Sequence, residues 1–248
     1  MRRSFGCARS TCASTQIAGI YEKRGEYARA IAEVERARSH GEARPLDLYV
    51  ASLRSRAGDF EGALAFLQGL LETSPDDAEL LYNIGVIHGE AKRGDEALRW
   101  MEKALEKQPD HAGALNYIGY SWAEKGTNLD RAEEYITRAL QIRPDDGYIT
   151  DSLAWVYYMR AQALGGSGRS RDARELLERA IRELERANEL TGGDPVISEH
   201  MGDVYLSLGL KERALKSYEE ALALEPRDDE QPALREKHER LRRELGRP

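Results

Sequence analysis

Apolar and small residues recur along this chain with the spacing of helices that each bury one face. Within residues 78–111, one stripe contains Leu81, Ile84, Gly85 and His88, and a second contains Ala97, Met101 and Ala104. Residues three and four apart share a face of an α-helix, so this spacing predicts two helices packed face to face. Pro109 and Asp110 end the second helix and open the next segment.

This helix-pair pattern repeats along the chain. Related segments close with a proline at 70–75, 104–109, 139–144 and 221–226, and the prolines at 75, 109 and 144 are 34 and 35 residues apart. Twelve residues before each proline stands an alanine, at 63, 97, 132 and 214. Further upstream lies a Gly or Ala beside an apolar residue, as in Ile84-Gly85, Ile118-Gly119, Leu153-Ala154 and Met201-Gly202. A helix hairpin of this kind cannot bury both faces alone, so it must stack on its neighbours.

These residues resemble the tetratricopeptide repeat (TPR) family, whose repeats are 34 residues long. The resemblance implies an all-α fold, a right-handed TPR solenoid of about six helix hairpins followed by a C-terminal capping helix. The expected repeats are 11–43, 44–77, 78–111, 112–146, 147–194 and 195–228, and the capping segment is 229–248. The first two repeats are degenerate, since Ala18 and Ala51 stand where glycine packs elsewhere.

The fifth repeat is longer than the others. The extra residues predict a first helix lengthened to about Leu164, a second helix starting near Ser170, and an exposed tip at Gly165–Gly168. Arg169, Arg171 and Arg174 make the tip locally basic, so it is either a tolerated insertion or a docking protrusion. After Pro226, an apolar stripe of Leu234, His238, Leu241 and Leu245 predicts the helix that closes the stack.

The first ten residues contain no clear targeting signal. Met1-Arg2-Arg3 has the charge of a signal peptide, but no apolar run follows it. Residues 1–10 are therefore expected to be a disordered leader, or to follow a start codon placed inside a longer gene. The chain as given is expected to be cytoplasmic, and periplasmic or envelope-associated if the true start lies upstream.

Composition removes several function classes. The net charge of −7 argues against a nucleic-acid binder, which needs a clustered basic face, and no run approaches 18 apolar residues, which argues against membrane insertion. The two cysteines and five histidines form no metal-ligand or catalytic motif, and neither a phosphate-binding loop nor a nucleophile elbow occurs. We therefore expect no enzymatic activity, no cofactor and no metal. His88 is expected to be a core residue, and the Asp pairs at 76–77 and 145–146 to cap helices.

The resemblance implies a concave groove lined by the first helix of each repeat, with residues between the packing positions pointing into it. The matching positions are Tyr82, Asn83, Asn116, Tyr117, Tyr120, Asp151, Trp155, Tyr158, Glu199 and Asp203. Asp151, Trp155 and Tyr158 share one helix face, and aromatic side chains offer large contact areas with few rotamers. Alternatively, these aromatic residues pack against neighbouring first helices. The acidic sixth repeat favours a ligand with aromatic or apolar anchors and some Lys or Arg.

Three interpretations of function follow. The first is a non-catalytic scaffold that binds a peptide or protein segment, and the repeat sequences are similar to bacterial TPR proteins, including envelope-associated ones. The second is the substrate-selecting repeat portion of a larger enzyme, such as a protease or glycosyl transferase, whose catalytic domain is absent. The third is a self-assembling scaffold, which Ile17, Ile20 and Tyr21 in the weakly capped first repeat leave open. The sequence leaves the oligomeric state undecided.

Overall fold

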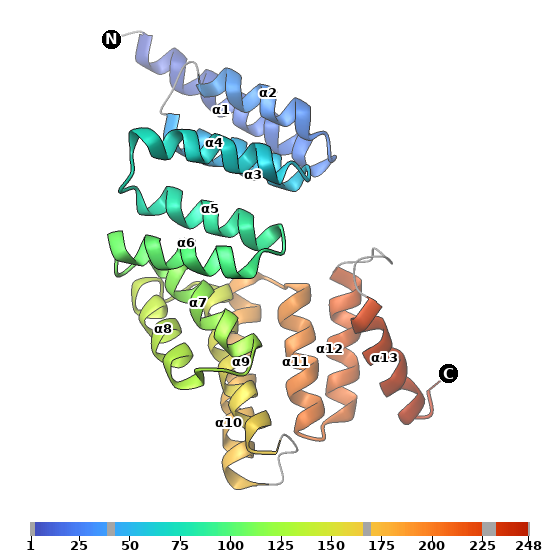
Figure 1. Ribbon diagram of the computed structural model, residues 1–248. Helices are drawn as coiled ribbons and strands as arrows, with labels where there is room; N and C mark the ends of the chain where they lie inside the picture. Colours follow the sequence, from blue (N-terminus) through green and yellow to red (C-terminus); the bar gives the residue numbers. More distant parts are fainter. Residues whose placement is uncertain (1–2, 39–42, 166–169, 225–231, 248) are drawn as a thin grey trace. The chain divides into compact units, whose positions relative to one another are not determined.

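A computed structural model describes residues 3–38, 43–165, 170–224 and 232–247 of the chain, with side chains from Ala13 onward in the first segment and from Arg44 in the second. This part of the chain contains thirteen α-helices and no strand (Figure 1). The prediction of an all-α solenoid of helix hairpins is thereby confirmed.

The helices alternate along the chain as hairpin partners, and each pair falls within one predicted repeat, apart from the starts of α1 and α3. They are α1 Arg3–Lys23, α2 Tyr27–Arg38, α3 Ala43–Arg56, α4 Phe60–Thr73, α5 Ala78–Glu90, α6 Gly94–Lys107, α7 Ala112–Glu124, α8 Leu129–Ile142, α9 Gly147–Ala163, α10 Arg171–Thr191, α11 Pro195–Ser207, α12 Lys211–Leu224 and α13 Pro232–Glu244.

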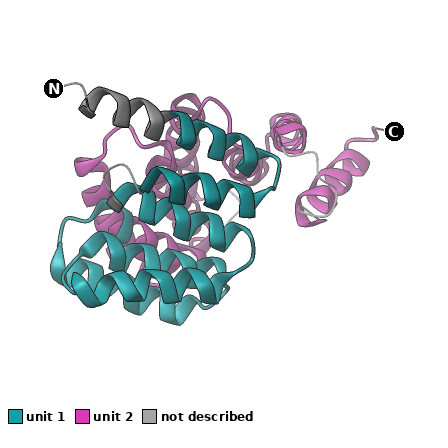
Figure 2. Cartoon of the chain, turned by 90° about the horizontal axis from the view of Figure 1, so that it is seen from above, with its two compact units in different colours: residues 1–114 teal, residues 115–248 magenta. Residues whose placement is uncertain are grey.

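The chain divides into two compact units, residues 1–114 and 115–248, which Figure 2 colours teal and magenta. Unit 1 contains α1 to α6, and unit 2 contains α8 to α13 together with most of α7. In unit 1, buried residues such as Val34, Leu53 and Ile84 form the seams between helices. In unit 2, Leu215, Tyr218, Leu234 and Leu241 form a cluster that joins α12 to α13.

Aspartates and serine start several helices by accepting hydrogen bonds from first-turn N–H groups, which have no partner within the helix. Asp77 accepts from the N–H of Leu80 at 3.1 Å, and Asp146 from those of Tyr148 and Ile149 at 3.1 and 3.2 Å. The expected capping role of the two Asp pairs is therefore confirmed for their second members.

Glycine lets the two helices of a hairpin approach closely. A Cβ built at Gly119 in α7 would lie 2.7 Å from Cγ1 of Ile136 and 3.1 Å from the carbonyl oxygen of Ala132, both in α8. Gly85 meets Met101 of α6, and Gly202 meets Tyr218 of α12, in the same way. The small residues of the sequence pattern therefore mark the points where the helices of a pair touch.

Gly119→Ala is expected to lower the free energy of unfolding by about 1–3 kcal/mol, because the added methyl group overpacks against a β-branched side chain and a backbone carbonyl. The matched control is Gly69→Ala in α4, where a Cβ meets nothing within 4 Å. That control should gain up to about 1 kcal/mol from helix propensity. Chemical denaturation followed by circular dichroism measures both, and equal shifts for the two variants would contradict this packing role.

At the ends of repeats, the structure differs from one expectation and agrees with another. Helix α1 begins at Arg3, so residues 3–10 are helical where a disordered segment was expected. The physical reason is that an established helix propagates at little cost through residues that contain no proline. In the fifth repeat, α9 ends at Ala163 and α10 begins at Arg171, each next to its expected limit.

The tip of the fifth repeat is described only in part. Residues 166–169 lie outside the described residues, so the expected exposure of Gly166–Gly168 and the position of Arg169 are not described. Arg171 and Arg174 each pair with a glutamate one helical turn later, Glu175 and Glu178, at 3.0 Å. Their charges are therefore compensated on α10, and the expected local excess of positive charge is correspondingly smaller.

Candidate functional site

Side chains of α9 and α11 meet in unit 2 and form what we call the α9–α11 cluster. It contains Asp151, Trp155 and Tyr158 from α9, and Glu199, His200 and Asp203 from α11. Helix α9 starts at its Asp146 cap, and α11 starts at its Asp194 cap with Pro195 in the first turn. Since residues three and four apart share a helix face, both triplets lie on one side of their helices.

Three rings stack in the centre of this cluster. The Trp155 ring lies 4.1 Å from the His200 ring and 4.7 Å from the Tyr158 ring, with interplanar angles of 23° and 27°. Trp155 and Tyr158 are half-buried, whereas His200 is buried. The indole Nε1 of Trp155 is itself buried and has no hydrogen-bond partner within the described structure. A half-buried indole offers apolar area to a ligand through the part of the ring that remains exposed.

Beneath the stack, Nδ1 of His200 lies 2.8 Å from Oδ1 of Asp151, and each side chain is 9% exposed. Burial alone would lower the pKa of His200, because it disfavours the charged imidazole. The hydrogen bond and charge of Asp151, together with the nearby carboxylates of Asp203 and Glu199, outweigh burial and raise this pKa above 6.5. Asp151 is therefore buried against the ring that stacks on Trp155, and a peptide-binding role for it stays a prediction.

The acidic end of the cluster is occupied by a lysine from α13. Nζ of Lys237 lies 2.7 Å from both Oε1 of Glu199 and Oδ2 of Asp203. The hydroxyl of Tyr218 in α12 donates to Oδ1 of Asp203 at 2.7 Å. Burial tends to lower the pKa of Lys237, but its hydrogen bonds to Asp203 and Glu199 raise it. Lys237 and Tyr218 are not among the residues predicted from the sequence. Lys237 could have been found from its spacing, since it lies three residues after Leu234 and four before Leu241, on the same helix face.

Helix α7 brings Tyr120 into the electrostatic neighbourhood of this cluster. Tyr120 is half-buried, and burial raises its pKa, followed by the charges of Glu124 and Asp151. Burial and Glu124 also raise the pKa of Tyr117. The side-chain carbonyl of Asn116 is buried without a hydrogen-bond partner among the described residues. Of these three α7 residues, Tyr120 has an electrostatic link to the α9–α11 cluster.

The two candidates in unit 1 lie in a different environment. The amide Nδ2 of Asn83 donates to the carbonyl oxygen of Glu79 at 2.8 Å, so it is engaged on its own helix. The Tyr82 ring lies 4.7 Å from the His111 ring and covers Gly113. A peptide-binding role for these two residues stays a prediction. His88 is buried on α5 as expected, and burial lowers its pKa.

One further polar side chain next to the cluster is engaged within its own helix. Ser152, next to Asp151, donates its hydroxyl to the carbonyl of Tyr148 at 3.0 Å, which leaves the hydroxyl engaged within α9. In the described segments, no group of three or more His, Cys, Asp or Glu side chains is arranged to hold a metal ion. Likewise, none of the described helices combines the length and apolar character that a membrane span requires. The cluster contains stacked rings and carboxylates that hold an ammonium group.

Comparison with known proteins shows which repeat family these helix pairs resemble. Sequence models of the tetratricopeptide repeat match residues 54–116, residues 101–147 with 158–193, and residues 199–228. A TPR repeat-containing protein of Pseudomonas aeruginosa, PA4667, is 30% identical over 187 residues, which cover 73% of this chain and 28% of the relative. The chain thus spans less than a third of that relative.

Two further proteins are similar. The protein O-mannosyl-transferase Tmtc2 of Drosophila melanogaster is 33% identical over 91 residues, which cover 36% of this chain and 9% of that protein. The crystal structure of TTC0263, a thermophilic TPR protein in Thermus thermophilus, superposes with a TM-score of 0.59 at 20% identity, covering 79% of this chain and 96% of that one. The repeat pattern, the helix hairpins and these matches agree: the chain belongs to the tetratricopeptide repeat family.

Proposed function

We propose that this chain is a non-catalytic protein-interaction scaffold that binds a peptide or protein segment through the α9–α11 cluster and Tyr120. TPR proteins generally bind proteins or peptides, and their repeats generally serve as interaction scaffolds. The single observation that carries the proposal is Trp155, which is half-buried and stacks with the rings of His200 and Tyr158. The part of such a side chain that remains exposed can anchor an apolar or aromatic residue of a ligand.

We expect affinity on the order of micromolar, because a few aromatic anchors must offset the cost of ordering a flexible segment. The electrostatics favour a segment that places its apolar or aromatic residue near Trp155 and a basic residue towards Glu199 and Asp203. The negative net charge disfavours nucleic acid as a partner.

The double variant Tyr120→Ala and Trp155→Ala is expected to lose a partner that the unchanged chain captures from extract of the source cells. Two anchors of the surface disappear, which should lower affinity at least tenfold. Quantitative mass spectrometry of the captured proteins provides the measurement. The matched control is Trp100→Ala on α6, whose half-buried ring in unit 1 lies 6.4 Å from His88.

Unchanged circular dichroism must accompany the loss, so that unfolding does not account for it. Equal retention of the same partner by the double variant and the unchanged chain would refute the proposed surface.

A second candidate function is the substrate-selecting repeat portion of a larger enzyme. The observation that favours it is the match to a protein O-mannosyl-transferase over 91 residues. Sequencing the coding region on both sides of this chain distinguishes the candidates, because a transferase domain in the same reading frame supports the second. A reading frame without a catalytic domain rejects it.

A further inference from the structure

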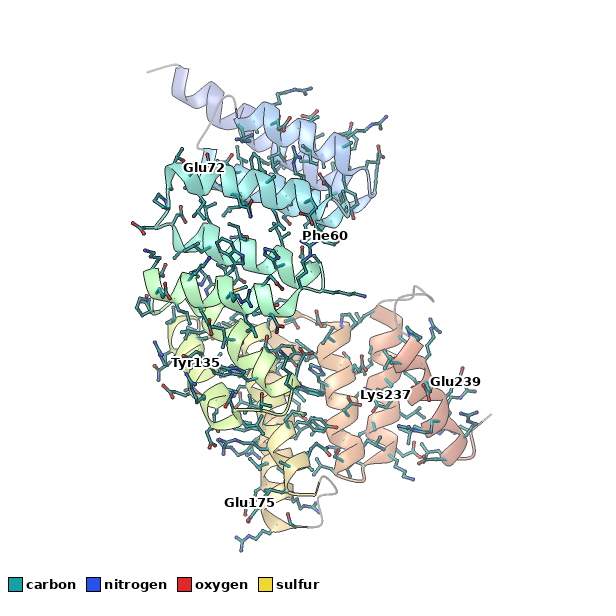
Figure 3. All side chains as sticks on the ribbon, viewed as in Figure 1. Phe60, Glu72, Tyr135, Glu175, Lys237 and Glu239 are labelled. Atoms are coloured by element: carbon teal, nitrogen blue, oxygen red, sulfur yellow. The ribbon has the colours of Figure 1, made fainter. Side chains whose placement is uncertain are left out.

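Helix α13 is held to unit 2 by two different kinds of contact. Leu234 and Leu241 are buried in one apolar cluster with Tyr218 and its α12 neighbours. Between them on the same face, Lys237 reaches past this seam to Glu199 and Asp203 of α11. Figure 3 shows Lys237 on the side of α13 that faces α12 and α11, with Glu239 on the other side. The apolar seam closes the end of the repeat stack, and the lysine contact adds a charge-specific link from α13 to α11.

The acidic pair holds the ammonium group closely but does not bury it fully. The side chains of Glu199, Asp203 and Lys237 are 25%, 12% and 30% exposed, and both N–O distances are 2.7 Å. Two carboxylates face one ammonium group, so these three residues retain a net charge of −1. This excess favours cationic side chains over neutral ones at this position.

The same acidic pair is continuous with the surface proposed to bind a partner. Glu199 and Asp203 flank His200, which stacks on Trp155. Asp203 and Lys237 are also close enough to Tyr158 for their charges to act on its hydroxyl group. A partner segment anchored at Trp155 and extending along α11 would therefore reach the position that Lys237 occupies.

Exchange of one ammonium group for another at this position costs little. The carboxylates are already partly desolvated, and an incoming lysine would restore the contacts that Lys237 gives up. The internal helix has the advantage of attachment to the same chain, which corresponds to a high effective concentration. A free partner helix must overcome this advantage, so α13 lowers the apparent affinity for it.

We propose that Glu199 and Asp203 form a binding site for a lysine side chain presented by a helix of a partner protein, and that Lys237 of α13 occupies this site in the free chain. The proposal rests on the proposed function, since it assigns the partner class for the acidic end of the same surface. Helix α13 then acts as an internal competitor as well as an end cap.

A peptide of residues 232–247 tests this proposal, because it presents the known occupant from outside and contains one lysine. It is titrated, with a fluorescent label, into the full chain and into the full chain with Leu234→Ala, Lys237→Ala and Leu241→Ala. The triple variant should bind the peptide at least tenfold more tightly, since its own α13 no longer competes. The single variant Lys237→Ala keeps the apolar seam and provides a second measurement if the triple variant loses helicity.

Two matched changes isolate the lysine contact. Adding Glu199→Gln and Asp203→Asn to the triple variant should weaken binding at least tenfold, and so should a peptide with alanine in place of its lysine. The alanine peptide retains every arginine, so general attraction to an acidic protein is preserved. Equal binding of the peptide to the unchanged chain and to the variants would overturn the proposal. So would binding that is unaffected both by Glu199→Gln with Asp203→Asn and by the alanine in the peptide.

The two proposals can fail separately. Loss of natural partner capture in the Tyr120→Ala and Trp155→Ala variant, combined with no peptide binding, retains the proposed function and rejects internal competition. Specific peptide binding combined with unchanged partner capture retains internal competition and rejects the proposed function.

Discussion

Asp151→Ala is expected to lower the free energy of unfolding by about 3 kcal/mol, because it leaves the buried His200 without its charged partner. Removal of one member of a buried ion pair costs about 3–5 kcal/mol. The lower end applies here, since His200 can release its proton once the carboxylate is gone, and burial then favours the neutral ring. Urea denaturation of the full chain measures the difference.

The matched control is Asp145→Ala, whose side chain is 82% exposed and lies 3.7 Å from the guanidinium of Arg186. It is expected to change the free energy of unfolding by less than about 1 kcal/mol. A loss of similar size for both aspartates would show that the His200–Asp151 pair has no special role.

The way in which the unfolding free energy depends on pH distinguishes an electrostatic contribution of the His200–Asp151 pair from a contribution of packing alone. Because the folded pKa of His200 is raised above 6.5, its stabilisation is fully present below pH 6.5 and disappears as pH rises through the folded pKa. His88 has a lowered pKa and acts in the opposite sense, so the comparison must use a variant. The difference in unfolding free energy between the unchanged chain and His200→Gln should shrink from pH 6 towards alkaline pH. A difference that grows with pH would contradict the assigned direction.

Local periodicity explains why most of the fold could be predicted from the sequence. The spacing of Gly, Ala and apolar residues within a helix pair depends on contacts between neighbouring helices, and the repeat copies that spacing along the chain. Local sequence also determines the start of α10 in the longer fifth repeat. Ser170 accepts a hydrogen bond from the N–H of Ala173 and caps this helix where its apolar pattern begins. The start of α1 could not be predicted, because no apolar stripe marks the part of this helix before residue 11.

The chemistry of the candidate site was only partly predictable. Repeat positions identified Trp155 and Asp203 as members of one surface, but not which groups they contact. The pairing of Asp151 with His200 joins residues 49 apart, and that of Lys237 with Glu199 joins residues 38 apart. Such pairings depend on helix crossing angles and on side-chain rotamers, which the period of the sequence does not contain. The hydrogen bond from the Asn83 amide to the carbonyl oxygen of Glu79 also depends on a side-chain rotamer, so it could not be predicted either.

Tyr218→Ala is expected to lower the free energy of unfolding by about 3–5 kcal/mol, which is typical of large aromatic side chains removed from a core. Tyr218 is fully buried, packs against Gly202 and joins the apolar cluster that holds α13. Tyr218→Phe retains the ring and removes only the hydrogen bond to Asp203, so about 1.5–3 kcal/mol is expected for this bond to a charged group. Denaturant titrations of both variants separate packing from hydrogen bonding.

Gly202 provides a stringent check of this contact. A Cβ at Gly202 would lie 2.2 Å from the Tyr218 ring, so Gly202→Ala alone should destabilise the chain. In the Tyr218→Ala background the ring is absent, and the same change should instead stabilise α11 by up to about 1 kcal/mol through helix propensity. A double-mutant cycle measures this reversal of sign as a coupling energy between the two positions. Additive effects of the two changes would mean that α11 and α12 do not meet at Gly202 and Tyr218, and the link from the apolar seam to Asp203 would then be lost.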